Sequence, residues 1–361
     1  MKVLYLINYA GSGGSERYVE LLAKAYHGKR CGCGLCYNVD GPLVRTMEEL
    51  GIPTHRIEMK SILDLGAAKK LAALVKAGGY DVIHAQYPRE NYIAILARQF
   101  GCKAKIIFTS HLIMEQPLPW KLLNRVFTPK NQAVLTVCTH GRQVLEKNGV
   151  AKDKIRVLFN GVDAAAAPRR DRSVLREFGI GDDELVISIL TRFSEEKGVP
   201  FLLRSIAKLK EMTDRPFRLL LVGTGPDFDR DKELLPQLGI EDRVVLTGFR
   251  RDTARLLAAS DLYLNSSSSE AMSFAILEAL AAGLPLVVTD VGGNPELVNT
   301  GNVCGLLAPY GDETAYAAAM ARLLEDDGLR GQFSAAAREK AEREFSIGKM
   351  LDGLFEIYQA T

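Results

Sequence analysis

The chain alternates short apolar runs with amphipathic segments, and it does so in two separate series. In residues 1–160 the apolar runs are KVLYLI, CGCGLCYN, DVIHAQY, KIIFTSH and AVLTVCT, and helical patterns such as ERYVELLAKAY lie between them. Strand-like runs at this spacing predict right-handed βαβ units, because consecutive parallel strands need a helical crossover. The first series therefore predicts an α/β fold on a parallel sheet.

A second series begins after a linker-like segment. The turn in KIRVLFNGVD is followed by DAAAAPRRDRS and then by the apolar runs LVISILTR, RLLLVGTGP, VVLTGF, DLYLNSS and LPLVVTD. A chain of 361 residues exceeds what one core usually supports, so we expect a domain boundary near Asn160. The final segment FSIGKMLDGLFEIYQAT predicts a helix with an apolar stripe that could pack on either domain.

Composition narrows the class of protein. The chain is 47% apolar and 25% charged, which is typical of a globular enzyme. Its first apolar run is too short for a secretory or membrane segment, and CGCGLC matches no common zinc spacing. We expect a reduced, cytoplasmic protein without a metal; the aspartates of DFDRD more simply begin a polar helix than bind one.

The charge is divided between the two halves. Residues 1–160 carry 23 Lys and Arg against 12 Asp and Glu, or +11, while residues 161–361 carry 23 against 32, or −9. Two halves attracting each other would explain this, and so would an anionic partner of the first half. The segment HLIMEQPLPWKLLNRVFTPK combines apolar and basic residues, so it is either peripheral to an anionic membrane or an ordinary helix packed on the sheet. We expect no nucleic-acid partner.

Glycine turns and cations follow the strands, where ligands bind in open α/β sheets. Gly13 and Gly14 lead into a helix whose N–H groups can meet phosphate, although Glu16 breaks the dinucleotide fingerprint. Arg192 and Lys197 could neutralise a pyrophosphate, or simply pair with nearby glutamates. Two further strand ends supply candidates for binding a nucleotide: Gly223, Phe249 and Arg250.

The stretch SEAMSFAILEAL places two carboxylates around a predicted helix start near Ser273. Glu270 would lie in the loop and Glu278 on the helix, and the first N–H groups, those of Ser273, Phe274 and Ala275, lack acceptors within the helix. The pair could hold a sugar and a ribose, or be a capping acid and a surface glutamate. His111, at another strand end, is either a ligand contact or a structural histidine.

Together the motifs resemble the family 4 retaining glycosyltransferases of GT-B fold. The resemblance covers almost the whole chain, through GGSE, SH, KIRVLFNGVD, TRFSEEKG, LLLVGTGP, VVLTGF, EAMSFAILE and DVGGNPELV. Its most specific part is the E-x7-E element. It implies two Rossmann-like domains facing across a cleft, with the C-terminal helix crossing back. Residues 1–160 with about 346–361 would bind the acceptor, and residues 161–345 the nucleotide-diphosphate sugar.

The resemblance also implies roles for the candidate residues. Arg192 and Lys197 would bind the diphosphate, Glu278 the ribose, and Phe249 with Arg250 the base. Gly13 and Gly14 would approach the phosphate from the first domain, and Gly223 would lie in the nucleotide site. Glu270, the N–H groups at the helix start and His111 would contact the donor sugar.

The implied reaction is metal-independent hexosyl transfer with retention, with UDP favoured over GDP, to a saccharide or lipid-linked acceptor in cell-surface glycan synthesis. Beyond the donor we expect no cofactor, and we expect a cytoplasmic enzyme that is peripheral on the inner membrane face if it docks. Met272 stands where many members have a smaller residue, so their donor sugar does not transfer to this chain. Two alternatives remain: a non-catalytic sugar-nucleotide-binding protein and an NAD-dependent oxidoreductase.

Overall fold

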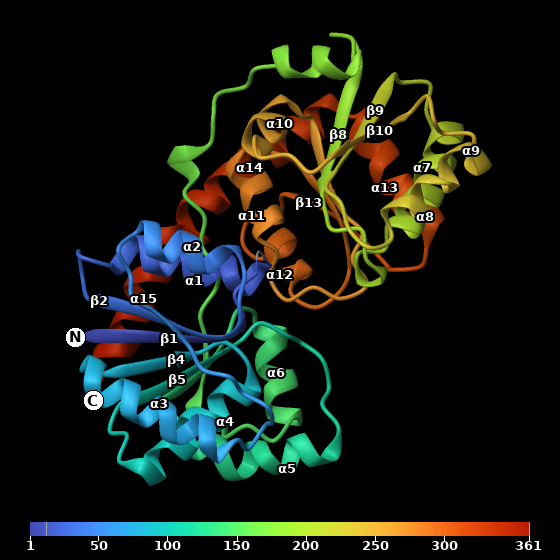
Figure 1. The fold of residues 1–361 in the computed structure, drawn as a ribbon. Helices are drawn as coiled ribbons and strands as arrows, with labels where there is room; N and C mark the ends of the chain where they lie inside the picture. Colours follow the sequence, from blue (N-terminus) through green and yellow to red (C-terminus); the bar gives the residue numbers. More distant parts are fainter. Residues whose placement is uncertain (12, 361) are drawn as a thin grey trace. The chain divides into compact units, whose positions relative to one another are not determined.

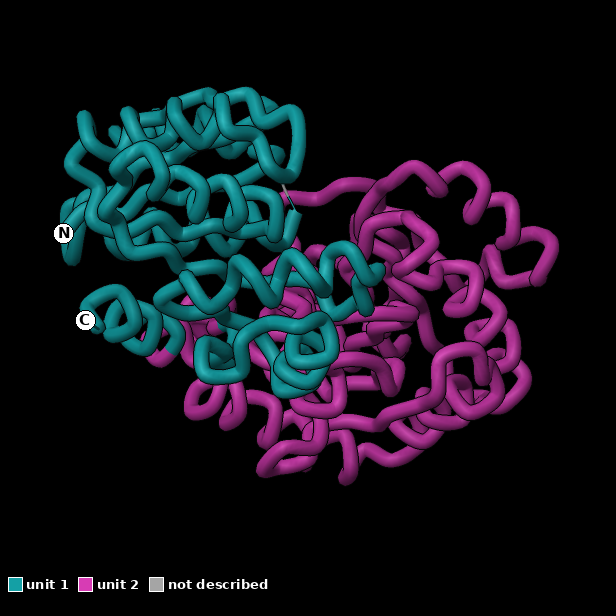
Figure 2. Tube along the Cα trace, turned by 90° about the horizontal axis from the view of Figure 1, so that it is seen from below, with its two compact units in different colours: residues 1–160, 350–361 teal, residues 161–349 magenta. Residues whose placement is uncertain are grey.

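The chain consists of two compact units, each built on one parallel sheet. The computed structural model describes residues 1–11 and 13–360. Unit 1 comprises Met1–Asn160 with Met350–Thr361, and unit 2 comprises Gly161–Lys349 (Figure 2). Every strand pairing in both sheets is parallel, so the predicted α/β class with two parallel sheets is confirmed.

Unit 1 has a seven-stranded sheet in the order β3-β2-β1-β4-β5-β6-β7. Figure 1 labels β1, β2, β4 and β5 of this sheet. Its strands are β1 (Lys2–Tyr9), β2 (Gly32–Val39), β3 (Thr54–Arg56), β4 (Val82–Ala85), β5 (Lys105–Ser110), β6 (Ala133–Thr136) and β7 (Ile155–Val157). The helices between them are α1 (Gly14–Tyr26), α2 (Pro42–Glu49), α3 (Leu65–Gly78), α4 (Pro88–Leu96), α5 (Leu118–Phe127) and α6 (Thr139–Lys147). The strand order reverses between β1 and β4, which makes that edge a ligand-binding position by topology.

Unit 2 has a six-stranded sheet in the order β10-β9-β8-β11-β12-β13. Its strands are β8 (Leu185–Leu190), β9 (Phe217–Val222), β10 (Val244–Gly248), β11 (Leu262–Asn265), β12 (Leu286–Thr289) and β13 (Gly305–Ala308). Its helices are α7 (Val199–Met212), α8 (Phe228–Lys232), α9 (Leu234–Leu238), α10 (Thr253–Ala259), α11 (Phe274–Ala281), α12 (Asn294–Asn299), α13 (Glu313–Glu325) and α14 (Asp327–Arg343). Here the order reverses between β8 and β11.

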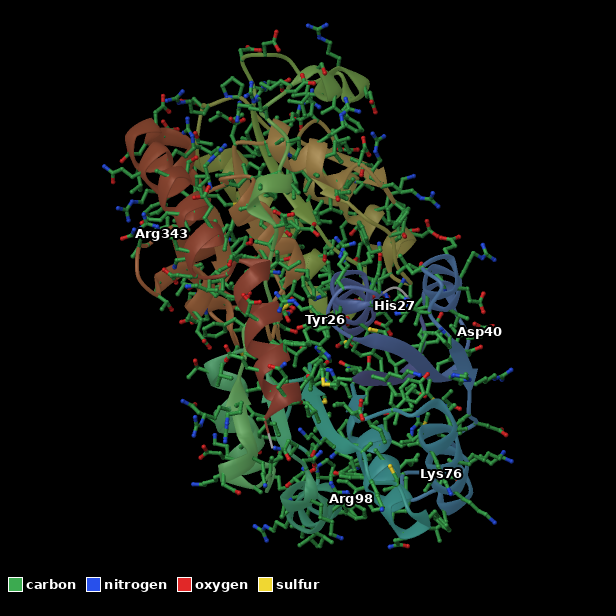
Figure 3. The ribbon with its side chains drawn as sticks, turned by 90° about the vertical axis from the view of Figure 1, so that its left-hand side faces the viewer. Tyr26, His27, Asp40, Lys76, Arg98 and Arg343 are labelled. Carbon is green, nitrogen blue, oxygen red and sulfur yellow. The ribbon has the colours of Figure 1, made fainter. Side chains whose placement is uncertain are left out.

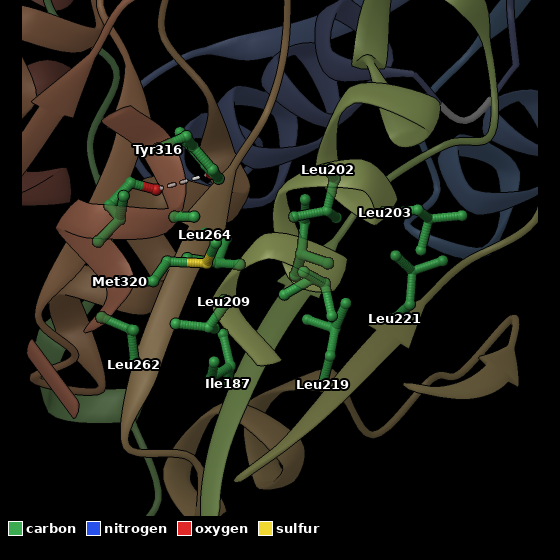
Figure 4. Packing of buried hydrophobic residues seen from close by; sticks show 14 of the residues in the cluster. Ile187, Leu202, Leu203, Leu209, Leu219, Leu221, Leu262, Leu264, Tyr316 and Met320 are labelled. Carbon is green, nitrogen blue, oxygen red and sulfur yellow. Dashed lines mark hydrogen bonds between the residues drawn. The ribbon is translucent and has the colours of Figure 1, made fainter. Parts of the chain in front are cut away.

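The strands of unit 2 are largely apolar, as expected of a sheet that helices cover on both faces. On one face, Ile187 and Leu219 pack with Leu209 of α7 and with α13 (Figure 4). On the other face, Leu220 packs with Leu256 of α10. Because helices bury both faces of the sheet, the residues available to a ligand lie in the loops at the ends of the strands.

The last helix, α15 (Ile347–Gln359), packs on unit 1 through its C-terminal part. The Tyr26 ring, labelled in Figure 3, lies 6.1 Å from the Tyr358 ring, and the Tyr358 hydroxyl hydrogen-bonds His84 Nδ1 at 2.6 Å. Residues 346–349 stay with unit 2, whereas the sequence placed the return near residue 346. The reason is a bridge in which Ile347 N donates to the carbonyl of Val162 at 2.9 Å.

Candidate functional site

The predicted site residues of unit 2 follow four neighbouring strands. Arg192 and Lys197 follow β8, Gly223 follows β9, Phe249 follows β10 and Glu270 follows β11. These strands are parallel and adjacent in the order β10-β9-β8-β11, so the loops that follow them lie side by side at the carboxyl ends of the strands. The loops after β8 and β11 flank the point where the strand order reverses, which is the usual ligand position in such sheets.

An ion pair joins the two loops at this point. Lys197 Nζ lies 2.8 Å from Glu270 Oε2, and the Ser267 hydroxyl donates to the same oxygen at 3.0 Å. The Glu270 side chain is 12% exposed, so it is held largely within the protein. Within residues 1–11 and 13–360, its other oxygen, Oε1, has no hydrogen-bond partner. The loop therefore offers one oriented carboxylate oxygen to a ligand.

Three hydrogen bonds hold the Glu270 loop in place. The Thr289 hydroxyl donates to the carbonyl of Ser267 at 2.7 Å, and Gly293 N donates to the carbonyl of Glu270 at 2.9 Å. Ser267 itself holds the carboxylate. Neither Ser267 nor Thr289 is predicted from the sequence, although both are buried hydroxyls at the ends of apolar strands, which is a pattern that could have identified them.

Lys197 is positioned by the glycine that follows it. Gly198 has φ +63°, and a Cβ there would lie 2.3 Å from the carbonyl oxygen of Ser266. The Ser266 hydroxyl in turn donates to the carbonyl of Lys197 at 2.8 Å. The turn η6 (Glu195–Lys197) can approach the loop that contains Ser266 this closely only because residue 198 has no side chain.

Gly223 also has a structural reason to be glycine. Its φ is +136°, and a Cβ would lie 1.9 Å from the carbonyl oxygen of Thr191. Its N–H donates to the carbonyl of Gly248 at 2.9 Å, so that N–H already has an acceptor within the protein. Close packing of three strand ends accounts for this residue, and its predicted nucleotide contact remains a prediction.

Arg250, Arg192 and Phe249 differ in whether neighbouring side chains pair with them. Arg250 donates to both oxygens of Asp252, each at 2.8 Å, and lies 3.0 Å from Glu177, and the hydrogen bond to Asp252 raises the pKa of its guanidinium. Its charge is thus compensated by neighbours. Arg192 is exposed and, among the described residues, forms no ion pair. Phe249 is 71% exposed, as a platform for a flat ligand would be.

The predicted helix start is confirmed, since Ser273 is the N-cap and α11 begins at Phe274. Ala275 is the second residue of the helix, so its N–H lies in the first turn. Glu278 is half-buried one turn further along. Burial raises the pKa of the Tyr263 phenol, and the charges of Glu278 and Glu270 raise it further, so both carboxylates lie near one ring.

In unit 1, Gly13 and Gly14 form the N-terminus of α1. Gly13 is the N-cap and Gly14 the first helical residue, and both are exposed. A Cβ on Gly14 would meet nothing within 4 Å, so packing within the chain does not require a glycine there. Open space at a helix N-terminus leaves room for a group that approaches the backbone.

His111 is held as a neutral imidazole. Its Nε2 lies 2.9 Å from Gln86 Oε1, and the Gln86 amide nitrogen donates to the carbonyl of His84 at 3.1 Å. This network assigns the proton to Nε2. Burial lowers the pKa of His111 to about 4, so at neutral pH Nδ1 is an acceptor. Among the described residues Nδ1 has no hydrogen-bond partner. A cavity of about 40 Å³ lies beside the ring, lined in part by Gln86, Tyr87 and Ser110.

The described chain, residues 1–11 and 13–360, lacks two features. No group of three or more His, Cys, Asp or Glu side chains there could hold a metal ion. No helix in the same residues has the length and apolarity needed to cross a membrane.

Comparison with known proteins identifies the family. Residues 12–166 match the model described as Glycosyltransferase Family 4, and residues 172–340 match that of Glycosyl transferases group 1. The N-acetyl-alpha-D-glucosaminyl L-malate synthase of Bacillus anthracis is 32% identical over 305 residues, which cover 82% of this chain and 78% of that protein. The chain belongs to the family 4 glycosyltransferases.

Another relative of this glycosyltransferase has a different acceptor in its name. This protein, from Campylobacter jejuni, is the N-acetylgalactosamine-N,N'-diacetylbacillosaminyl-diphospho-undecaprenol 4-alpha-N-acetylgalactosaminyltransferase, 25% identical over 347 residues and 92% of both chains. The crystal structure of Anabaena Alr3699/HepE in complex with UDP has a TM-score of 0.86 and 23% identity over 100% of both chains. The two units of this glycosyltransferase thus have the GT-B fold.

Proposed function

We propose that this glycosyltransferase moves a hexosyl group from a UDP-sugar to a saccharide or lipid-linked acceptor, with retention at the anomeric carbon, in the synthesis of a cell-surface glycan. UDP is favoured over GDP because HepE, a structural relative, has been crystallised with UDP. The relatives named above use L-malate and a diphospho-undecaprenol glycan as acceptors, so both soluble and lipid-linked acceptors occur among them.

In this proposal unit 2 binds the donor and stabilises its leaving group. Arg192 and Lys197 bind the diphosphate, whose negative charge grows as the glycosidic bond breaks. Two cations at one loop edge stabilise such charge without a metal, since a fixed positive charge acts most strongly on the transition state. Phe249 supports the base, with Arg250 and Gly223 close to it.

The observation that carries the proposal is Glu270 Oε1, which has no hydrogen-bond partner among the described residues. The other oxygen is occupied by Lys197 and Ser267, so Oε1 is oriented to accept from a hydroxyl of the donor sugar. The N–H groups of Ser273, Phe274 and Ala275 donate to the sugar from the start of α11. Glu278, further along α11, accepts from both ribose hydroxyls.

In this proposal, residues of unit 1 contact the donor as well as the acceptor. The backbone at Gly13 and Gly14 approaches the phosphate, and His111 Nδ1 accepts from a sugar hydroxyl. We assign no nucleophile to the protein and no covalent intermediate. The leaving phosphate oxygen takes the proton of the acceptor hydroxyl on the face where the new bond forms.

A thermal-shift comparison tests the function against its alternatives. UDP should raise the melting temperature, whereas NAD should not. A shift with NAD alone would reject the proposed donor. A Glu278→Ala variant should bind UDP about 10-fold to 150-fold more weakly, because bonds to a charged carboxylate contribute about 1.5–3 kcal/mol. A non-catalytic sugar-nucleotide-binding protein would bind UDP-sugars but transfer no sugar, which mass spectrometry of acceptor mixtures would reveal.

We place the enzyme in a reducing, cytoplasmic compartment. All six cysteines are buried and none forms a disulfide in the described chain, as expected where thiols stay reduced. We propose no nucleic-acid partner. A further proposed partner is an anionic membrane surface, which the +11 charge of residues 1–160 would attract.

A further inference from the structure

Unit 2 has a cavity of about 310 Å³ at the end of its sheet opposite the candidate donor site. The cavity is lined by Asp261 and Pro285, which immediately precede β11 and β12, whereas the donor-site candidates follow the carboxyl ends of the strands. Residues 168–170, the C-terminal ends of α10 and α11, and one face of α14 form the rest of its wall; α11 packs against both other helices (Figure 1). Small-molecule sites have volumes of about 300–1,000 Å³, so the cavity is large enough for a small ligand.

Three arginines line the cavity, and one of them has a complete structural role. Arg330 donates through Nη1 to the carbonyls of Leu323 and Leu324 at 2.7 and 3.0 Å, and through Nη2 to Asp327 at 2.8 Å. The two carbonyls lie at the C-terminal end of α13, where the last carbonyls of a helix lack intrahelical donors. Capping of α13 therefore accounts for Arg330.

The other two arginines keep donors that the protein does not use. Arg170 donates to the carbonyl of Ser260 at 2.9 Å and to Asp261 at 2.6 Å. Among the described residues Arg338 forms one hydrogen bond, a long one of 3.4 Å to the carbonyl of Ala282, and no ion pair. A guanidinium has five N–H donors, so both side chains have donors left for a ligand.

A glycine allows Arg338 to lie against the end of α11. Gly283 has φ +75°, and a Cβ there would lie 2.3 Å from Arg338 Nε. Any side chain at residue 283 would therefore displace the guanidinium. Ser334 lies one turn before Arg338 on the same face of α14, and its hydroxyl has no hydrogen-bond partner among the described residues. The cavity thus has a cation and a hydroxyl side by side.

The wall of the cavity carries an excess of positive charge. Asp261 pairs with Arg170 at 2.6 Å, and Asp327 pairs with Arg330 at 2.8 Å, so these four charges compensate one another. The charge of Arg338 is left over. Residues 161–361 carry a net charge of −9, so this excess is a local reversal of sign. A concave site with surplus positive charge attracts anions.

We propose that the cavity binds the phosphate monoester of a small sugar at a site separate from the donor site. Arg338 and Arg170 donate to the phosphate, because guanidinium groups match its geometry. A phosphate alone would fill only part of the cavity, and Ser334 with the carbonyl of Ala282 can bond the hydroxyls of an attached sugar. Helix α11, with a length of roughly 12 Å, separates Ala282 from the N-cap Ser273, so this ligand is not the donor.

Titration calorimetry with glucose 6-phosphate tests the site in the intact protein. The titration is made with saturating UDP and again without it, and we expect saturable binding of equal affinity in both. Glucose lacks the phosphate and should not bind. Inorganic phosphate should bind more weakly than glucose 6-phosphate, because it makes no contacts through hydroxyls.

Arginine variants locate the binding. Arg338→Ala and Arg170→Ala should each bind glucose 6-phosphate at least about tenfold more weakly, since each removes hydrogen bonds to a charged group. Arg338→Lys should lie between Arg338→Ala and the wild type, because it keeps the charge and loses the planar pair of donors. Arg343→Ala is the matched control: Arg343 lies on the same helix with 77% of its side chain exposed, outside the cavity, and this variant should bind like the wild type.

Four outcomes overturn the inference. They are no binding of glucose 6-phosphate, loss of that binding when UDP is present, equal affinities of Arg338→Ala and the wild type, and equal affinities for glucose 6-phosphate and inorganic phosphate. Stabilisation of each variant by UDP checks that it is folded. If UDP stabilises the protein and glucose 6-phosphate does not bind, only this inference fails; if glucose 6-phosphate binds and UDP does not, the proposed function fails.

Discussion

Replacing Glu270 with glutamine exchanges a hydrogen-bond acceptor for a donor at one atom. Lys197 at 2.8 Å and Ser267 at 3.0 Å both donate to Oε2. The amide oxygen of the variant can take that place, which puts the NH₂ group where Oε1 was. A sugar hydroxyl that donates to Oε1 then meets another donor. Since a hydrogen bond to a charged group contributes about 1.5–3 kcal/mol, kcat/KM should fall roughly 10-fold to 150-fold.

The same substitution should leave the affinity for UDP unchanged or raise it. UDP has no sugar to lose the contact, and the Lys197 ammonium no longer has a full counter-charge beside it. Titration calorimetry with UDP and initial rates with a UDP-sugar measure the two quantities on one preparation. As a control, Ser267→Ala keeps both carboxylate oxygens as acceptors and should lower kcat/KM less. Equal losses of UDP affinity and of kcat/KM in Glu270→Gln would refute a specific contact to the sugar.

An alanine at position 198 should be more harmful than one at position 239. Gly198 and Gly239 both have φ +63°, but a Cβ would lie 2.3 Å from a carbonyl oxygen at the first and would meet nothing within 4 Å at the second. In urea denaturation Gly239→Ala should cost about 1–2 kcal/mol of unfolding free energy, and Gly198→Ala at least about 1 kcal/mol more; equal costs would contradict the close approach. Tyr358→Phe removes the hydroxyl that bonds His84, so it should lower the unfolding free energy by about 1–3 kcal/mol, and an unchanged urea midpoint would argue against that bond. Burial lowers the pKa of His111 from 6.5 to about 4, so the unfolded state binds more protons between these values. The contribution of His111 to the free energy of unfolding is then fully present above pH 6.5, and it falls toward pH 4 by about 1.4 kcal/mol per pH unit. The difference between the stability curves of the wild type and His111→Gln should show this slope, and a flat difference curve would contradict the assignment.

Local pattern was sufficient for the main elements of the fold. The long apolar runs of β1 and β9 and the start of α11 follow from residues next to one another in the chain. The strands that the sequence did not predict are β3, β7 and β13, each three or four residues long. All three lie at the edge of a sheet, where a strand has one neighbour and is less completely buried, so the apolar pattern is weak.

The sequence by itself determined two parallel α/β sheets and the chemical types of residue at the strand ends, because spacing and apolar periodicity are local properties. Only the tertiary structure decided which of these residues meet. Lys197 and Glu270 are 73 positions apart, and they pair because the strand order places β8 beside β11. The same holds for Arg250, whose charge Glu177 compensates, and for α5, whose sequence has apolar residues on two faces. Which face the core covers is decided by the sheet beneath it, and that leaves the stripe of Leu118, Leu122 and Val126 in contact with solvent.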